Sequence, residues 1–232
     1  MSELLEKFRT LKHLPLFPLP LVLLPNELLP LHIFEPRYRQ MLKDLESGQQ
    51  YFGVSLFEPN PGVDKPPTGT TGCIAEVRES HPLPDGASNI LTMGIIRYRL
   101  IDYIDAGEPY LVGDLEFFED VEEDDADELT ALAENVHTLF KRVAKAAFQL
   151  SGSRGRLPDI PKSSPQELSF LIATAFNLDN ELKYQMLETD STSERLNRLN
   201  EILLHTVDKM EDSASIQKVA QTNGHGQKKI DL

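Results

Sequence analysis

Apolar and polar positions alternate along the first half of the chain and follow a helical repeat along the second half. Alternation typical of half-buried strands runs through residues 73–77, 89–96 and 97–104. The later repeat predicts a long helix over 126–150, whose buried face carries Leu132, Val136, Leu139, Phe140 and Val143. Strands therefore come first and helices last, which predicts an α+β fold with the two kinds of element separated along the chain.

The most apolar segment, residues 14–38, contains six prolines. Proline removes a backbone donor and clashes with the preceding helical turn, so no continuous helix, and no membrane-spanning helix, can run through it. We predict extended chain here, with a short strand over 20–24. A helix is expected to begin at Pro36 and to end near Gly48, with Tyr38, Met41, Leu42 and Leu45 on its apolar face.

Three more helix starts can be read from capping residues. Ser164–Glu167 and Ser191–Glu194 have the spacing of capping boxes, and Asp179 is expected to start a short helix. The helical repeat ends near Met210, and the polar residues after it favour disorder. The expected organisation is a lead-in over 1–10, a strand-rich domain over 11–125, a helical bundle over 126–210 and a disordered tail over 211–232.

The net charge of −14 is concentrated in residues 51–128, which hold eighteen acidic and four basic side chains. Such a surface repels nucleic acid and anionic membranes, so neither is expected as a partner. The end of the acidic run at 114–128 is predicted to be an exposed connector that favours the following helix start. The single cysteine, Cys73, cannot form an internal disulfide, and no secretory or transit signal is apparent, so we expect a cytoplasmic protein.

Residue patterns for catalysis, cofactors and metals are missing. No Gly-Lys pair exists for a phosphate-binding loop. No two of the six histidines lie three to five residues apart, so no helical pair of zinc ligands exists. The segment 152–155 falls one residue short of a nucleophile elbow and lies between predicted helices. We therefore predict no catalytic residue, no cofactor and no metal.

One cluster could line a recognition cleft. His32, Phe34, Glu35, Arg37 and Tyr38 lie at and just before the predicted helix start, and exposed apolar positions there suit binding. Structural readings remain open for two members. Glu35 and Arg39 are four residues apart and could pair across one helical turn. His32 lies among apolar residues and could be an edge or core side chain.

Several motifs occur in the order found in one protein family. LPLFPLP, then LPLHIFEPRYRQM, then FGVSLF make the chain resemble the N-terminal substrate-binding domain of Lon proteases over about residues 11–207. The resemblance implies a PUA-like, β-barrel-type domain with one inserted helix, followed by a C-terminal α-helical bundle. Full-length Lon continues into an ATPase module and a Ser-Lys protease module. Neither has a counterpart in these residues, so no catalytic role is carried over.

In Lon this domain helps to select polypeptides for degradation. The resemblance therefore implies a non-catalytic module that binds unfolded or partly folded polypeptides and selects or delivers them to a separate ATP-dependent protease. Two alternatives stay open. The chain could be a PUA-like protein that binds a small ligand or RNA, or a regulatory or assembly partner of a protease. A monomer or a weak homo-oligomer is expected.

Overall fold

The computed structural model describes residues 3–11, 13–151, 163–176 and 178–223, and the chain forms two compact units. Unit 1 contains Met1–Glu122 and Ala173–Ser191, and unit 2 contains Glu123–Ile172 and Thr192–Leu232. The expected organisation placed the whole of 126–210 in the helical part. The structure differs for 173–191, which group with the strands.

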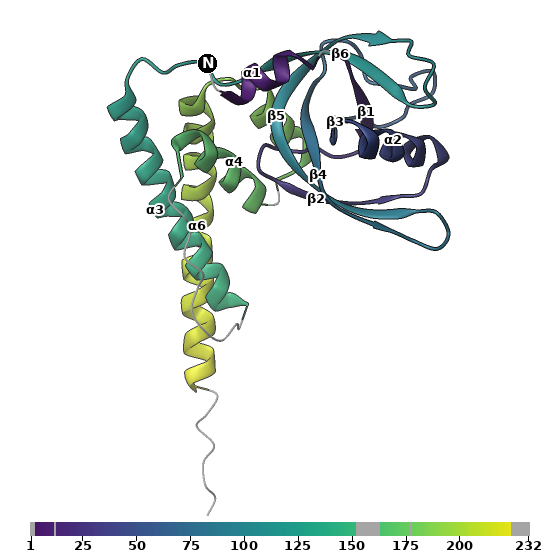
Figure 1. Ribbon diagram of the computed structural model, residues 1–232. Helices are drawn as coiled ribbons and strands as arrows, with labels where there is room; N and C mark the ends of the chain where they lie inside the picture. Colours follow the sequence, from purple (N-terminus) through teal and green to yellow (C-terminus); the bar gives the residue numbers. More distant parts are fainter. Residues whose placement is uncertain (1–2, 12, 152–162, 177, 224–232) are drawn as a thin grey trace, which may run out of the picture. The chain divides into compact units, whose positions relative to one another are not determined.

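Unit 1 is built on a six-stranded sheet that closes on itself (Figure 1). Its elements are α1 (Glu3–Arg9), β1 (His13–Leu19), β2 (Leu28–Ile33), α2 (Pro36–Ser47), β3 (Tyr51–Leu56), β4 (Thr71–Pro82), β5 (Ser88–Ile104), β6 (Leu111–Phe118) and α5 (Asn180–Glu188). The strand order is β2-β5-β4-β3-β1-β6, and β5 also pairs with β6, so five strands form a closed barrel. Strand β2 pairs with the first part of β5. The α+β class and the barrel-type domain with one inserted helix are confirmed.

Strand β1 changes its partner at Leu16. It pairs antiparallel with β6 over residues 13–16 and parallel with β3 over 16–19. The Phe57 amide donates to the Leu19 carbonyl at 2.8 Å. The amide and carbonyl of Leu19, and of every second residue before it in β1, therefore point toward β3. Those of the residues in between point toward β6.

This change of partner explains how β1 contains prolines. Pro15 lacks its donor on the β3 side, before the β3 ladder begins, and Pro18 lacks its donor on the β6 side, after the β6 ladder ends. Neither proline removes a ladder bond. The prediction of a strand over 20–24 is wrong. The strand lies earlier in the chain, and 20–24 belongs to the connection that leads to β2.

The barrel interior is filled by large side chains that pack against glycines. Tyr98 of β5 is fully buried, and burial raises the pKa of its hydroxyl. A Cβ atom added at Gly53 of β3 would lie 2.7 Å from a Leu16 methyl and 2.8 Å from the Tyr98 hydroxyl. Only glycine leaves room for this aromatic side chain between the strands.

The turns and the inserted helix follow the sequence pattern closely. Helix α2 begins at Pro36, and the Gly48 amide donates to the Leu45 carbonyl at its end. The β4–β5 hairpin turns through Gly86, which has a φ of 81°, in the left-handed region that glycine adopts without strain. Both predictions are confirmed.

Helix α5 belongs to unit 1 because its side chains and its end bond to the barrel. The Lys183 ammonium lies 2.6 Å from the Glu27 carboxylate, and both side chains are mostly buried. The Thr71 amide donates to the Tyr184 hydroxyl at 3.1 Å. Arg97 of β5 donates to the Thr189 carbonyl just after the helix, at 2.6 Å. Such contacts between residues far apart in sequence leave no periodic trace, so the sequence did not predict them.

Unit 2 is built around two long helices, α3 (Ala126–Leu150) and α6 (Thr192–Asn223), with most of α4 (Pro165–Ala175). Asn135 bonds to Asn200 at 3.0 Å and Arg142 to Glu211 at 2.9 Å, so α3 and α6 run side by side in the same direction. Figure 1 shows this pair. The predicted bounds of α3 are confirmed.

Two helix starts of unit 2 have side-chain caps, and the one before α4 is a capping box predicted from the sequence. Asp125 accepts from the amides of Asp127 and Glu128 at the start of α3. Ser164 and Glu167 exchange bonds as a capping box before α4. Helix α6, however, continues to Asn223, past the predicted end near Met210. No glycine or proline occurs in residues 211–223, so the backbone can remain helical after the apolar repeat has ended. The rest of the expected disordered tail lies outside the described residues.

The acidic connector is more ordered than predicted. Asp120 pairs with the buried Arg97, and both side chains are almost fully covered. Glu123 accepts from the amide and the hydroxyl of Ser193, both at 2.9 Å, at the start of α6. The connector residues 121, 122 and 124–128 are exposed as predicted, whereas Asp120 and Glu123 are partly covered because they find partners far away in the sequence. No helix in the described part of the chain has the length and hydropathy to cross a membrane.

Candidate functional site

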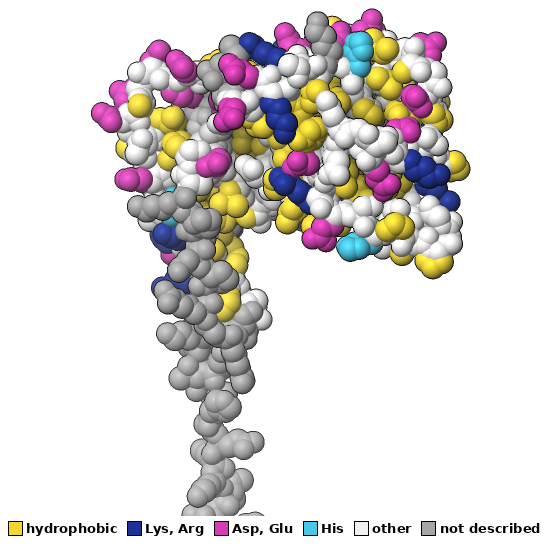
Figure 2. All heavy atoms as spheres, in the orientation of Figure 1, with side chains coloured by type: hydrophobic (Ala, Val, Ile, Leu, Met, Phe, Trp, Pro, Cys, Tyr) yellow, Lys and Arg dark blue, Asp and Glu magenta, His cyan; other side chains and the backbone are white. Residues whose placement is uncertain are grey.

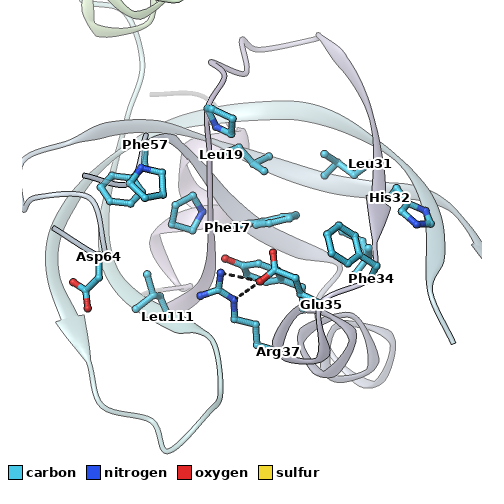
Figure 3. Close-up of a pocket in the computed structure, with 15 residues that line it drawn as sticks. Phe17, Leu19, Leu31, His32, Phe34, Glu35, Arg37, Phe57, Asp64 and Leu111 are labelled. Atoms are coloured by element: carbon cyan, nitrogen blue, oxygen red, sulfur yellow. Dashed lines mark hydrogen bonds and ion pairs between the residues drawn. The ribbon is translucent and has the colours of Figure 1, made fainter. Parts of the chain in front are cut away.

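A pocket of about 320 Å³ opens in unit 1 between β1, β2 and the start of α2 (Figure 3). Two further segments complete its wall, the loop after β3 and the start of β6. Its lining is mostly apolar and comprises Phe17, Pro18, Leu19, Pro20, Leu31, His32, Ile33, Phe34, Glu35, Arg37, Tyr38, Phe57, Pro59, Asp64 and Leu111.

The inner wall is aromatic. The ring centroids of Phe17 and Tyr38 lie 4.0 Å apart, and those of Phe17 and Phe52 lie 6.1 Å apart. Burial raises the pKa of the Tyr38 hydroxyl, and the nearby Arg37 only partly offsets this effect. Tyr38 therefore stays neutral under ordinary conditions, and this wall offers an uncharged surface to a ligand.

The rim combines an exposed aromatic ring with polar groups. Phe34 is 58% exposed and stacks on His32 at 5.8 Å between ring centroids. The His32 Nδ1 atom lies 2.8 Å from the Asn89 side-chain oxygen, which fixes the imidazole at the edge of the pocket. Because this exposed ring lies at the mouth of a concave, mostly apolar pocket, Phe34 is a candidate contact for a ligand.

The charged pair at the helix start differs from the predicted one. The Glu35 carboxylate lies 3.0 Å from the Arg37 guanidinium, which also lies 4.5 Å from the centre of the Tyr38 ring. The alternative pairing of Glu35 with Arg39 is wrong. Arg39 instead donates to the Asp85 carbonyl at 3.2 Å, because its side chain points toward the β4–β5 hairpin.

Local backbone preferences explain why this pair lies at the pocket. Glu35 is extended, with φ −65° and ψ 135°, as expected of a residue that precedes proline. Its side chain makes no capping bond to α2, so the carboxylate turns to Arg37 at the pocket rim. The proline that starts the helix thereby also positions the charged rim.

The structure brings all five residues of the predicted cluster, His32, Phe34, Glu35, Arg37 and Tyr38, to this one pocket. That they bind a ligand stays a prediction. Sequence reasoning missed the other lining residues, among them Leu19, Phe57, Asp64 and Leu111. The first two were visible only as apolar positions of ordinary core type. The other two come from the loop after β3 and from the start of β6, whose approach to the pocket no periodicity encodes.

The pocket has the properties of a binding site for apolar side chains. It is concave and mostly apolar, and a few polar groups are fixed at its rim. Its carboxylates, Glu35 and Asp64, lie at the solvent-exposed rim. In the described part of the chain, no three or more His, Cys, Asp or Glu side chains gather as a metal site would require.

Comparison with known proteins points in one direction. Residues 13–205 match the family model of the ATP-dependent protease La (Lon) substrate-binding domain. The chain is 26% identical over 219 residues to the Lon protease of Dictyoglomus thermophilum, covering 88% of this chain and 26% of that protein. It is 25% identical over 224 residues to the Lon protease of Syntrophus aciditrophicus, covering 92% and 28%. The chain thus spans about a quarter of the length of these relatives.

Two solved structures have the same fold. A Lon N-terminal domain protein from Xanthomonas campestris superposes with a TM-score of 0.58 at 24% identity, covering 81% of this chain and 96% of that chain. The N-terminal domain of the Mycobacterium avium complex Lon protease gives 0.60 at 20% identity, covering 83% and 98%. At this level of identity the likeness concerns the fold.

Proposed function

Because this chain belongs to the family of Lon substrate-binding domains, we propose that it binds unfolded or exposed polypeptide segments and catalyses no reaction itself. The pocket between β1, β2 and α2 is the proposed binding site. The observation that carries the proposal is Phe34, a large aromatic side chain that is 58% exposed at the mouth of an apolar pocket. Unfolded chains expose the apolar side chains that such a pocket accepts.

Charge supports a polypeptide ligand over nucleic acid. Unit 1 holds twenty-three acidic and eleven basic residues, a net charge of −12. Figure 2 shows acidic side chains spread over the visible face of this unit. A phosphate backbone would be repelled by this surface, because affinity for nucleic acid depends on basic side chains.

The biological role that fits is selection or delivery of substrates to a separate ATP-dependent protease. These residues contain no group that could couple nucleotide hydrolysis to unfolding. The proposed module therefore binds a segment but does not unfold it. The buried free thiol of Cys73 fits a reducing compartment, and the proposed place of action is the cytoplasm. The proposed state is a monomer or a weak homo-oligomer.

Titration with a fluorescent, permanently unfolded protein tests the proposal. Binding should saturate, with modest affinity, because ordering a flexible ligand costs entropy. Phe34→Ala should weaken binding about fivefold or more, since a buried aromatic contact contributes about 1 kcal/mol or more.

Ile101→Ala is the matched control. Ile101 is also an exposed apolar residue of unit 1, at 47%, but it does not line the pocket. Its replacement should leave binding unchanged. Equal losses in the two variants, or no saturable binding by the unaltered protein, would contradict the proposed site.

A further inference from the structure

Strand β2 has a free backbone edge. It pairs only with β5 in the described sheet. The Gly94 amide donates to the Glu27 carbonyl at 2.9 Å, and Leu28 lies opposite Met93. In an antiparallel pair every second residue bonds to the partner strand. Counting from Glu27, the backbone groups of Leu28, Pro30 and His32 face away from β5.

This edge has the donors and acceptors of an unfinished sheet. Leu28 and His32 each present an amide and a carbonyl, while Pro30 presents a carbonyl alone. A proline at an outward-facing position removes no bond to β5, which explains why β2 tolerates it. Exposed edges of this kind pair readily with other extended chains.

Across the pocket, the end of β1 is open on the same side. Its ladder with β6 stops at Leu16, and the backbone of Pro18 faces the side that β6 has left. Pro18 offers a carbonyl but no amide, and β1 and β2 do not pair with each other in the described sheet. The pocket lies where the barrel leaves two strands unjoined, and Figure 3 shows Phe17 and Leu19 of β1 facing Leu31 of β2 across it.

Apolar side chains lie at both ends of the β2 edge. Leu28 is 57% exposed at one end, and Phe34 is 58% exposed just beyond the other. The adjoining pocket is lined by the paired Glu35 and Arg37 and by Asp64, so its charged side chains sum to −1, in a unit of net charge −12. The edge therefore suits an extended segment with apolar side chains and with Lys or Arg between them.

We propose that a client polypeptide adds to β2 as an extra strand, bonding to the outward backbone groups of Leu28 and His32 and placing one apolar side chain in the pocket. This inference rests on the proposed function and gives it a mechanism and a ligand class. Backbone bonds supply affinity that does not depend on sequence, and the pocket selects the side chain. Because Pro30 has no amide to donate, the ladder between β2 and the added strand lacks one bond, which keeps the added strand short.

The first test uses a labelled nonapeptide, Lys-Ser-Leu-Lys-Phe-Lys-Leu-Ser-Lys, acetylated and amidated at its ends. Each internal amide is methylated in turn, and binding to the full chain is measured by fluorescence anisotropy. A strand that adds to an edge bonds through every second residue. Methylation should therefore weaken binding about tenfold at alternating positions, since each lost bond costs about fivefold and the methyl group adds a clash. The positions between should change less than twofold.

The second test removes one donor from the protein. His32→Pro deletes the outward amide and should leave the bonds to β5 intact, as Pro30 does already. His32→Ala is the matched control, because it loses the same imidazole contacts to Asn89 and Phe34 but keeps the amide. His32→Pro should bind the peptide about fivefold more weakly than His32→Ala. Thermal unfolding of both variants shows whether the fold is kept.

The outcomes separate the two proposals. An alternating methylation pattern supports strand addition. Binding with a flat methylation profile overturns strand addition but leaves polypeptide binding in the pocket standing. An absence of binding by this peptide and by unfolded proteins overturns the proposed function itself. The chain could instead dimerise through β2. If dimerisation competes with peptide binding, a second copy of the chain and not a client polypeptide is the natural occupant of the edge.

Discussion

Replacing Arg97 by methionine should destabilise unit 1 more than any change at a surface charge. The guanidinium is only 2% exposed and donates to the Leu187 carbonyl at 3.1 Å and the Thr189 carbonyl at 2.6 Å. It also pairs with Asp120, whose side chain is 7% exposed, and stacks on the Phe118 ring at 4.5 Å. Methionine keeps the length and apolar bulk of the side chain but satisfies none of these polar partners.

The expected cost follows from what remains behind. Breaking a buried ion pair by removing one partner costs about 3–5 kcal/mol, because the other charge stays in a poorly solvated place. That is a large share of the roughly 5–15 kcal/mol that keeps a domain folded. Arg99→Met is the control. It lies two residues away on β5, pairs with Glu116 at 3.7 Å, and is half exposed, so its loss should cost less than about 1 kcal/mol.

Urea unfolding followed by far-UV circular dichroism measures both costs. The chain has no tryptophan, so the six tyrosines provide the fluorescence signal. Hydrogen exchange of the β5 amides assigns the loss to unit 1. In a double-mutant cycle, Arg97→Met combined with Asp120→Leu should cost at least about 2 kcal/mol less than the two single costs together. If Arg97→Met and Arg99→Met have the same effect, or the cycle shows no coupling, the buried pair of Arg97 and Asp120 does not stabilise unit 1 as reasoned.

Three further outcomes are expected. Burial raises the pKa of the Cys73 thiol to about 12 from an ordinary value near 9. The contribution of the neutral thiol to the free energy of unfolding is therefore complete below about pH 9 and is lost as pH rises toward 12. Urea unfolding across that range should show the loss, on the order of a few kcal/mol, and Cys73→Ala should show less of it. Ser164→Ala removes the capping box with Glu167 and should lower the stability of unit 2 by about 1 kcal/mol, while Ser213→Ala, an exposed serine within α6, serves as the comparison in the same melts. Exchanging the lysines of the test peptide for glutamates should weaken its binding at low salt, and a higher salt concentration should narrow the difference; equal affinities at low salt would rule out the electrostatic preference.

Elements with a local cause could be predicted from the sequence. The start of α2 at Pro36, the turn at Gly86 and the cap at Asp179 each follow from one residue type with one conformational preference. It could also be predicted that the residues around Phe34 lie together, because bulky apolar side chains stand beside charges at a helix start. The sequence could therefore indicate where one wall of the pocket lies.

Features set by partners far away in the chain could not be predicted. The prolines of β1 are compatible with a strand only because its ladder passes from β6 to β3 at Leu16, and this pairing is not encoded locally. Asp64 and Leu111 reach the pocket through connections whose path depends on the closed barrel. Glu27 and Lys183 meet across 156 positions, so neither charge has a recognisable role in its own segment.

The chain passes from unit 1 to unit 2 after Glu122, returns at Ala173 and leaves again after Ser191. Neither unit is thus one uninterrupted stretch of polypeptide. A truncated fragment that stops at Glu122 would retain the pocket but lose α5, exposing the Glu27 carboxylate and the Arg97 guanidinium without their partners in 173–191. A fragment designed to contain unit 1 alone should therefore join 173–191 to 1–122 through a short linker.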